Sequence, residues 1–378
     1  MRAFNIVADE NMPLVEALFG DYGSIRKVNG RTLCADDLID ADILLVRSVT
    51  QVNSTLLKNS RIKFVGSATI GTDHIDEEYL ARSQIHFAHA PGCNANSVVQ
   101  YVLSALAFAG RLTALLAGSQ QLAIVGVGNV GSRLARVCEI LGINYKPYDP
   151  PRADTEPEEY DWVSWEQVLN SDVISLHVPL QQSVSNNTHH LFAAHTLEQL
   201  QQETLLINTA RGAVVDNQAL TEALKSKNIQ AILDVWENEP EISVALRQRC
   251  LLSTPHIAGY SKQGKEQGTR MIFQAFLSYF KLEDKTFSQP TVQSLGHEIL
   301  WNNKLTFAEN LTSSILSAYP IETDSFDLCQ LSETALKNGF DNLRKHYKDR
   351  HEYPQWTIKN ITNRDDIKRM KALGFRLV

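Results

Sequence analysis

Short apolar runs alternate with helix-like segments along most of the chain. In the first 90 residues these runs occupy residues 4–9, 42–48, 62–68 and 85–90. A second series occupies residues 121–128, 143–149, 172–178, 204–210, 229–235 and 251–257. Because short β-rich runs separated by helices are typical of parallel sheets covered on both faces, the pattern predicts an α/β fold.

Two longer segments have a helical pattern. Residues 94–116 are almost free of charge and predict a long helix buried between domains, and residues 260–282 predict a second long helix. After Pro290 the chain changes to mixed helix and loop with Trp301 and Trp356. This change of character indicates a separate small module at the C-terminal end.

Composition limits the class of protein. A chain of 378 residues exceeds what one hydrophobic core usually serves, and its net charge of -7 speaks against a nucleic-acid partner. The five cysteines have no metal-ligand spacing, so we expect reduced thiols and no bound metal.

No apolar run approaches the roughly 20 residues that span a bilayer, and an acidic residue appears too early for a secretory signal. We therefore expect a cytoplasmic protein without a membrane partner.

A glycine-rich turn follows the apolar run at residues 121–128. Gly126, Gly128 and Gly131 have G-x-G-x-x-G spacing between a strand and a helix, which is the context that dinucleotide binding requires. The first glycine permits a tight turn, the second lets a pyrophosphate approach the backbone, and the third permits close helix–strand packing. Around Asn129 and Val130 the helix would begin and offer N–H groups to phosphate.

An acidic residue lies about twenty positions further on, as this motif requires. Asp149 ends the run at residues 143–149 and would bind the adenosine ribose hydroxyls. A carboxylate there repels a ribose phosphate and favours NAD over NADP, although Arg152 leaves this choice open. The alternative is an α/β domain with a tight turn and no nucleotide.

Three later strand ends each present one charged or titratable residue, namely Arg211, Glu239 and His256. Singly they are consistent with an ion pair, a loop residue and a packed histidine. Together they match oxidation of a 2-hydroxy acid. A histidine can take the hydroxyl proton, a carboxylate can orient its ring, and a guanidinium can hold the substrate carboxylate by two hydrogen bonds.

Four sequence strings, "AIVGVGNVG", "NTARGAVVD", "LDVWENEP" and "TPHIAGY", occur in an order and spacing that resembles the D-isomer-specific 2-hydroxyacid dehydrogenases. The resemblance implies a Rossmann-type NAD-binding domain, a flavodoxin-like split substrate domain and a small C-terminal α+β dimerisation domain. The implied boundaries are 1–95 for the first part of the substrate domain, 96–256 for the NAD-binding domain, 257–288 for the returning helix of the substrate domain and 289–378 for the dimerisation domain.

The resemblance also implies roles for single residues. Catalysis would rest on Arg211, on Glu239 rather than Glu237, and on His256. The residues implied to bind NAD are Gly126, Gly128, Asn129, Val130, Gly131, Asp149, Val178, Thr209, Ala210, Arg211, Asp234 and Gly259. The residues implied to bind substrate are Ser48, Thr69 and Tyr260.

Some residues near these motifs have alternatives that the sequence leaves open. We add Arg47 as a phosphate clamp, with a surface ion pair as its alternative, and ordinary turn chemistry is the alternative for Ser48 and Thr69. Val178 stands where relatives often place a polar residue, so a hydroxyl contact to the cofactor would be missing. We expect His177 to be structural. Nothing beside Cys93 suggests a nucleophile.

The strings "NMPLVEALFG", "VRSVTQVN", "KFVGSATIGTDHID" and "TPHIAGYS" carry a closer resemblance, which extends over essentially the whole chain. They resemble a subgroup of the family that oxidises 4-phospho-D-erythronate in vitamin B6 biosynthesis. In that subgroup the last 90 or so residues form a dimerisation module, which implies a homodimer. Two alternatives stay open: the same chemistry on another D-2-hydroxy acid such as 3-phosphoglycerate, and an NAD-sensing binding protein.

Overall fold

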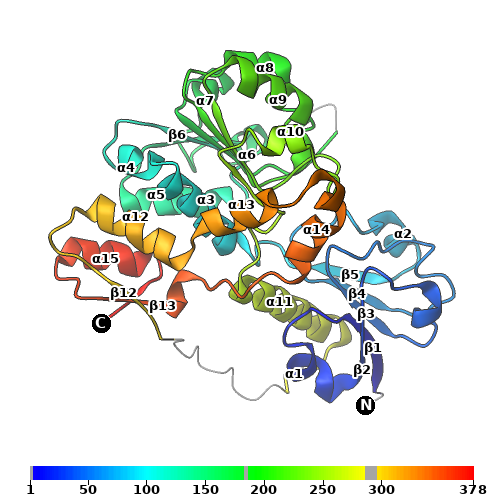
Figure 1. Cartoon of the computed structure of the whole chain (residues 1–378). Coiled ribbons are helices and arrows are strands. Elements are labelled where there is room, and N and C mark those ends of the chain that lie inside the picture. The colour runs from blue at the N-terminus through cyan, green and yellow to red at the C-terminus, as the bar shows by residue number, and fades with distance from the viewer. Residues whose placement is uncertain (1–2, 183–185, 286–295) are drawn as a thin grey trace. The chain divides into compact units, whose positions relative to one another are not determined.

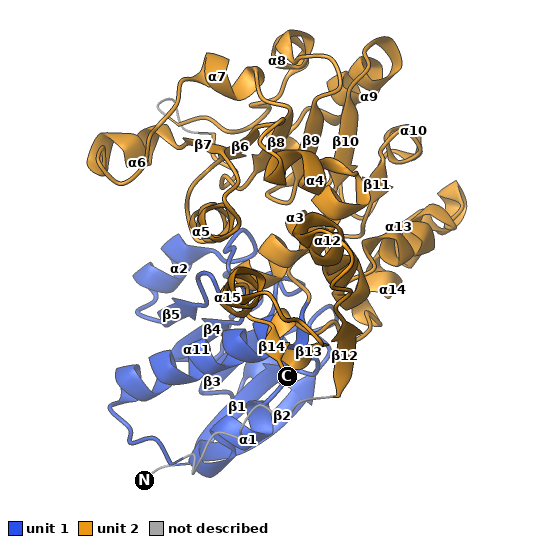
Figure 2. Ribbon diagram, turned by 90° about the vertical axis from the view of Figure 1, so that its left-hand side faces the viewer, with its two compact units in different colours: residues 1–94, 261–293 blue, residues 95–260, 294–378 orange. Residues whose placement is uncertain are grey.

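The chain divides into two compact units, which Figure 2 shows in different colours. The computed structural model describes residues 3–182, 186–285 and 296–378. Unit 1 comprises residues 1–94 and 261–293, and unit 2 comprises residues 95–260 and 294–378. The expected boundary between residues 288 and 289 lies outside the described residues. The division into three domains stays a proposal.

Unit 1 contains a parallel sheet of order β2-β1-β3-β4-β5, the flavodoxin-like order. Its strands are β1 (Phe4–Asp9), β2 (Gly23–Val28), β3 (Ile43–Val46), β4 (Phe64–Ser67) and β5 (His86–His89). Its helices are α1 (Val15–Phe19), η1 (Gly20–Tyr22), η2 (Ala35–Leu38), α2 (Glu77–Arg82) and α11 (Lys262–Phe280). The apolar pattern missed β2, because this edge strand is only half-buried and largely polar.

The helical pattern at residues 260–282 correctly predicted the long helix α11, which follows the first part of unit 2 in sequence and belongs to unit 1. Phe273 and Phe276 are buried against Phe19, whose ring centroid lies 5.1 Å and 5.2 Å from theirs. These aromatic contacts attach the helix to the sheet core, since each buried ring removes a large apolar area from water.

Unit 2 contains a parallel sheet of order β11-β10-β9-β8-β6-β7, visible at the top of Figure 1. Its strands are β6 (Leu122–Val125), β7 (Tyr145–Tyr148), β8 (Val173–Leu176), β9 (Leu205–Asn208), β10 (Gln230–Leu233) and β11 (Leu252–Ser253). The chain reverses direction across the sheet between β6 and β8. Ligands of such sheets bind outside the carboxyl ends of the strands at this switch point.

Helices cover both faces of this sheet. They are α3 (Ala95–Phe108), α4 (Arg111–Leu116), α5 (Gly131–Leu141), α6 (Pro150–Thr155), α7 (Trp165–Leu169), α8 (Ala194–Gln199), η3 (Gly212–Val214), α9 (Asn217–Ser226) and α10 (Val244–Arg247). The single helix predicted over residues 94–116 is wrong. Gly110 adopts φ +69° before α4, and this left-handed residue separates α3 from α4. No described helix is long and apolar enough to cross a membrane.

The C-terminal module, residues 296–378, combines a parallel sheet with helices. Its strands, in the order β12-β13-β14, are β12 (His297–Leu300), β13 (Trp356–Lys359) and β14 (Arg376–Leu377). Its helices are α12 (Phe307–Ala318), α13 (Ile321–Cys329), α14 (Glu333–Lys345), η4 (Tyr353–Gln355) and α15 (Arg364–Ala372).

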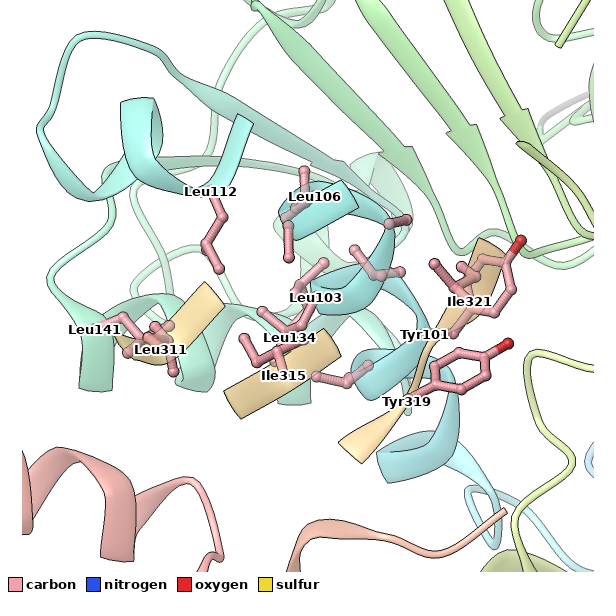
Figure 3. Close-up of a cluster of buried hydrophobic side chains, with 14 of the residues drawn as sticks. Tyr101, Leu103, Leu106, Leu112, Leu134, Leu141, Leu311, Ile315, Tyr319 and Ile321 are labelled. Carbon is pink, nitrogen blue, oxygen red and sulfur yellow. The ribbon is translucent and has the colours of Figure 1, made fainter. Parts of the chain in front are cut away.

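Apolar side chains of this module join the core of unit 2. Figure 3 shows Leu311 and Ile315 of α12 beside Leu103 of α3 and Leu134 of α5, and all of them are almost fully buried. Removing the module would therefore expose the side of α3 that it covers. The module therefore shares one hydrophobic core with the helices that cover the sheet of unit 2.

Candidate active site

The glycine turn after β6 has the close approaches that the motif requires. Gly126 adopts φ +88°, and a Cβ on it would lie 2.7 Å from the backbone of His177 and Val178. No L side chain fits there without displacing the end of β8. At Gly128, by contrast, a Cβ would meet nothing within 4 Å. The turn is closed toward the sheet and open on the side where a pyrophosphate would approach, so it fits a dinucleotide.

Asp149 lies at the end of β7 directly beside this turn. Its Oδ2 accepts a hydrogen bond of 2.8 Å from the N–H of Val127, and its side chain caps α6. Arg152 forms an ion pair of 2.7 Å with Glu156 and donates to the Val127 carbonyl. Because Glu156 partly neutralises Arg152, the local charge favours ribose hydroxyls over a ribose phosphate, in agreement with NAD.

The loop after β9 fixes the backbone of Arg211. The Asn208 side chain accepts from the N–H of Ala210 at 3.0 Å and donates to the carbonyl of Arg211 at 2.9 Å. A Cβ on Gly212 would lie 1.9 Å from the carbonyl carbon of Trp236, so only glycine fits beside the next loop. The close approach at residue 212 explains why the half-buried Arg211 is followed by glycine.

His256 and Glu239 form the pair that the sequence predicted. The Nδ1 of His256 lies 2.7 Å from Oε2 of Glu239, and the other carboxylate oxygen accepts from the N–H of Trp236 at 2.8 Å. Burial raises the pKa of Glu239, but the positive charge and hydrogen bond of His256 outweigh it, so the net pKa lies below the usual value. The ionised carboxylate orients the imidazole and leaves Nε2 for the substrate.

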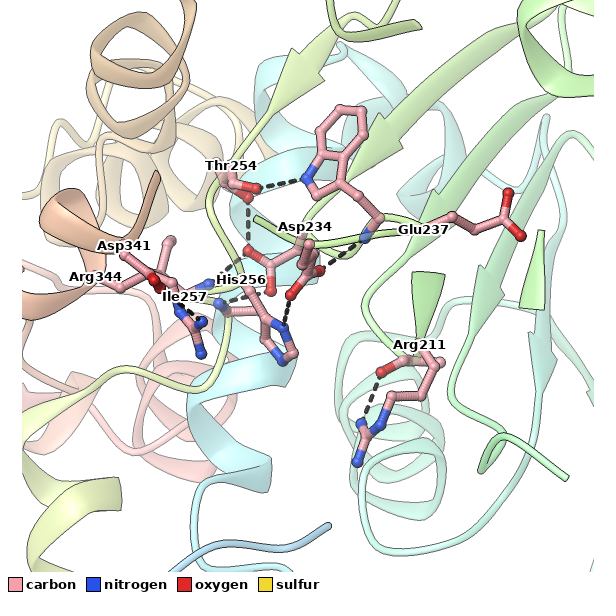
Figure 4. A network of polar contacts seen from close by, with 12 residues as sticks. Arg211, Asp234, Glu237, Thr254, His256, Ile257, Asp341 and Arg344 are labelled. Atoms are coloured by element: carbon pink, nitrogen blue, oxygen red, sulfur yellow. Dashed lines mark hydrogen bonds and ion pairs between the residues drawn. The ribbon is translucent and has the colours of Figure 1, made fainter. Parts of the chain in front are cut away.

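Asp234 holds the loop that carries His256. Its buried carboxylate accepts from the hydroxyl of Thr254 at 2.7 Å and from the N–H groups of Ile257 and Ala258 at 2.8 Å and 2.9 Å, as Figure 4 shows in part. Burial raises the pKa of Asp234, and the charge of His256 and these hydrogen bonds oppose the rise without cancelling it. The three bonds hold the backbone where His256 has φ +57°, which only a well-supported loop tolerates.

The structure brings most of the predicted site residues to the carboxyl edge of the unit 2 sheet. They are Gly126, Gly128, Asn129, Val130, Gly131, Asp149, Val178, Thr209, Ala210, Arg211, Asp234, Glu239, His256, Gly259 and Tyr260. His177 lies beside them between Ser175 and Thr209, at 2.9 Å and 3.3 Å. Burial lowers the pKa of His177 to about 3, so this imidazole is neutral near pH 7 and serves the structure.

The remaining predicted residues belong to unit 1. The Nε of Arg47 forms an ion pair of 2.9 Å with the buried Asp9, and Thr69 Oγ1 lies 2.7 Å from Ser67 Oγ. Ser48 is exposed in the turn that follows β3. Arg47 therefore forms an ion pair, but with a buried partner and not at the surface as its alternative interpretation had it. The substrate roles of these three residues stay predictions.

Sequence reasoning missed two arginines of the C-terminal module. Arg344 at the end of α14 donates from Nη2 to the hydroxyl of Tyr260 at 3.3 Å. The buried Arg350 donates to the carbonyl of Ala258. Both contact the loop after His256, yet neither lies in a recognisable motif. Their position in a charged segment about 90 residues downstream carried no signal that could have identified them.

The low pKa of Glu239 leads to a pH prediction. Because its pKa is lowered, the Glu239 carboxylate keeps its charge at and above the ordinary pKa of a glutamate and loses it only in more acidic solution. Glu239→Gln removes this charge at every pH, so kcat/KM should fall at least about 10-fold across the neutral range. An unchanged kcat/KM in Glu239→Gln would contradict the pairing. The neighbouring Glu237→Gln is the control.

Comparisons with known proteins agree with this geometry. Residues 108–258 match the family model for the NAD-binding domain of D-isomer-specific 2-hydroxyacid dehydrogenases. The fold is that of D-lactate dehydrogenase from Aquifex aeolicus, solved with NAD and lactic acid, at a TM-score of 0.60 and 24% identity over 73% of this chain and 95% of that one. The fold and the site thus define an NAD-dependent dehydrogenase of the D-2-hydroxyacid class.

Relatives that match almost the whole chain identify a particular family within this class. Erythronate-4-phosphate dehydrogenase from Pseudomonas fluorescens (strain SBW25) is 43% identical and covers 92% of both chains. The enzyme of the same name from Marinobacter nauticus is 42% identical over 98% of this chain and 99% of its own. The chain belongs to the erythronate-4-phosphate dehydrogenase family.

Proposed function

We propose that the chain oxidises 4-phospho-D-erythronate at its C2 hydroxyl to (R)-3-hydroxy-2-oxo-4-phosphooxybutanoate, as a step of vitamin B6 biosynthesis. The observation that carries this proposal is the match to relatives of that name over 98% of the chain, which extends through the C-terminal module. The solved 2-hydroxyacid dehydrogenases, by contrast, cover about three quarters of the chain, 73% in the case of the D-lactate enzyme.

The proposed roles follow the site geometry. His256 accepts the hydroxyl proton at Nε2, and Glu239, 2.7 Å from Nδ1, stabilises the imidazolium that forms. Arg211 holds the substrate carboxylate through two charge-assisted hydrogen bonds. When bound, NAD supplies the acceptor for the C2 hydride. Oxidation is complete when the proton resides on His256 and C2 carries a carbonyl.

The proposed ligand contacts come from the sequence motifs. The glycine turn and Asp149 would hold the pyrophosphate and the ribose, and Val178, Thr209, Ala210, Asp234 and Gly259 would line the rest of the cofactor. For the substrate we propose contacts from Ser48, Thr69, Tyr260 and Arg47. At Val178 only backbone groups can make polar contacts, because its side chain is apolar.

A substrate panel tests the proposal. NADH formation is followed with 4-phospho-D-erythronate, 3-phospho-D-glycerate, D-lactate and D-glycerate, and a 2-oxo acid is added as acceptor so that tightly bound NADH cannot hide turnover. We expect selective oxidation of the four-carbon phosphate. Preference for the three-carbon phosphate would identify a phosphoglycerate dehydrogenase. NAD binding without oxidation of any of the four would favour an NAD sensor.

Assembly and location are proposed as well. A homodimer through the C-terminal module is supported by its exposed apolar residues Leu300 and Phe326, which are 71% and 62% exposed. Sedimentation of the full chain checks this, and a monomer at micromolar concentration would refute it. A cytoplasmic location is supported by the cysteine content, because five cysteines, an odd number scattered along the chain, are usual for a protein with reduced thiols. Fractionation of cells that express the chain would test it.

A further inference from the structure

The last turn of helix α14 carries a cationic side chain, that of Arg344, which lies at the edge of the candidate active site. The helix is anchored by Leu336 and Phe340, which are 3% and 0% exposed in a cluster that includes Trp236. Arg344 follows Phe340 by four residues and so lies on the same face of the helix. Its Nη2 donates to the hydroxyl of Tyr260 at 3.3 Å. The packing of α14 thus fixes Arg344 beside the loop of the catalytic histidine.

The guanidinium of Arg344 is buried without full compensation. Its side chain is 14% exposed, and Nη1 lies 3.6 Å from Asp341, at the outer range of an ion pair. Among the described residues, no acceptor is in hydrogen-bond range of the buried Nε. Burying a charged donor without an acceptor is costly, because its hydration is lost and not replaced. A ligand can reach only the 14% of the side chain that is exposed, and an anion bound there would offset part of the cost of burying the charge.

Figure 4 shows where this cation lies relative to the chemistry. The His256 imidazole lies between the side chains of Arg344 and Arg211. A four-carbon hydroxy acid with a terminal phosphate carries one anion next to its reacting carbon and a second at the other end. With C2 beside His256 and the carboxylate on Arg211, the phosphate end extends away from Arg211.

We propose that Arg344 binds the phosphate of the substrate and is the specificity-determining residue that the C-terminal module contributes. This inference rests on the proposed function, since it names the group that recognises the second anion. Arginine suits the task because its planar fork matches two phosphate oxygens and keeps its charge at every working pH. Hydroxy acids without the phosphate gain nothing from this residue.

The second arginine of the module does not compete for this role. Arg350 donates to the carbonyl of Ala258 and to the Ser97 hydroxyl, and its guanidinium stacks on Tyr319 at 4.3 Å. Arg350 therefore holds the backbone of the loop. The alternative is that Arg344 has a purely structural role and only holds Tyr260 in place. The experiment must distinguish this role from binding of the substrate phosphate.

The test compares two substrates in two variants of one helix. In Arg344→Gln we expect kcat/KM for 4-phospho-D-erythronate to fall about 100-fold, the size of one charge-assisted contact. With D-erythronate, which lacks the phosphate, the same variant should lose less than about 5-fold. Inorganic phosphate should inhibit the unmodified enzyme competitively and Arg344→Gln much more weakly. Lys337→Gln, on the exposed face of the same helix, removes an equal charge and should change neither ratio.

The outcomes separate the two proposals. Equal losses on both substrates, or unchanged inhibition by phosphate, would overturn the role of Arg344 while the proposed function stands. If the unmodified chain does not oxidise 4-phospho-D-erythronate, the proposed function itself fails. Should Arg344→Gln not fold, Arg344→Lys keeps the charge without the fork, and we expect a selective loss of about 10-fold on the phosphorylated substrate. An unselective loss in that variant would equally overturn the inference.

Discussion

Replacing His256 with asparagine is expected to lower kcat about 1,000-fold and to leave NAD binding unchanged. General acid–base catalysis typically contributes 100- to 10,000-fold, and asparagine cannot take a proton from the substrate hydroxyl. Asparagine is chosen because residue 256 has φ +57°, a left-handed conformation that asparagine tolerates better than most residues. The loss should therefore reflect chemistry rather than strain. Single-turnover kinetics measure the rate of the chemical step, and a fluorescence titration with NADH measures binding of the nicotinamide cofactor.

His190 offers a matched control for this variant. It also has positive φ, at 50°, and its Nε2 lies 2.7 Å from Glu237, which belongs to the loop that carries Glu239. His190→Asn therefore removes a histidine–glutamate pair of the same length outside the proposed chemistry, and kcat should change less than about 5-fold. Similar losses in both variants would show that loop integrity, and not proton transfer, depends on His256.

The sheets could be predicted from the sequence because their strands are short apolar runs that end at polar or glycine residues. The prediction missed β2 for the opposite reason, since an edge strand with the sequence GSIRKV keeps its polar side chains in solvent. The hydrophobic pattern also predicted one helix where the structure has two, α3 and α4. Both segments are apolar, and the break depends on the backbone of Gly110 rather than on a change of polarity.

The catalytic candidates were predictable because parallel strands bring their carboxyl ends to one edge. Arg211, Glu239 and His256 each follow such a strand closely, so a linear pattern translates into a spatial cluster. Arg344 could not be found in this way, because packing of α14 and not strand order brings it to the site. The role of Asp234 in supporting the loop was hidden as well, since hydrogen bonds to backbone N–H groups leave no trace in residue types.

Replacing Asp234 with alanine is expected to cost about 4 kcal/mol in the local stability of the loop at residues 254–260. The change leaves the Thr254 hydroxyl and the N–H groups of Ile257 and Ala258 without the acceptor that now lies 2.7 to 2.9 Å away. Unsatisfied buried donors each cost about 1–3 kcal/mol, and the relief of burying a carboxylate offsets only part of the sum. Hydrogen exchange at the amides of Ile257 and Ala258 should accelerate about 1,000-fold.

Asp172 is the appropriate comparison for this variant. Its carboxylate accepts one exposed backbone N–H, that of Gln121, at 2.8 Å, ahead of β8. Asp172→Ala should cost less than about 1 kcal/mol, because water replaces the lost acceptor. If exchange at Ile257 and Ala258 is no faster in Asp234→Ala than in Asp172→Ala, the carboxylate does not hold the loop. If exchange accelerates as predicted, the position of His256 depends on the buried carboxylate of Asp234, and the orientation of its ring depends on Glu239.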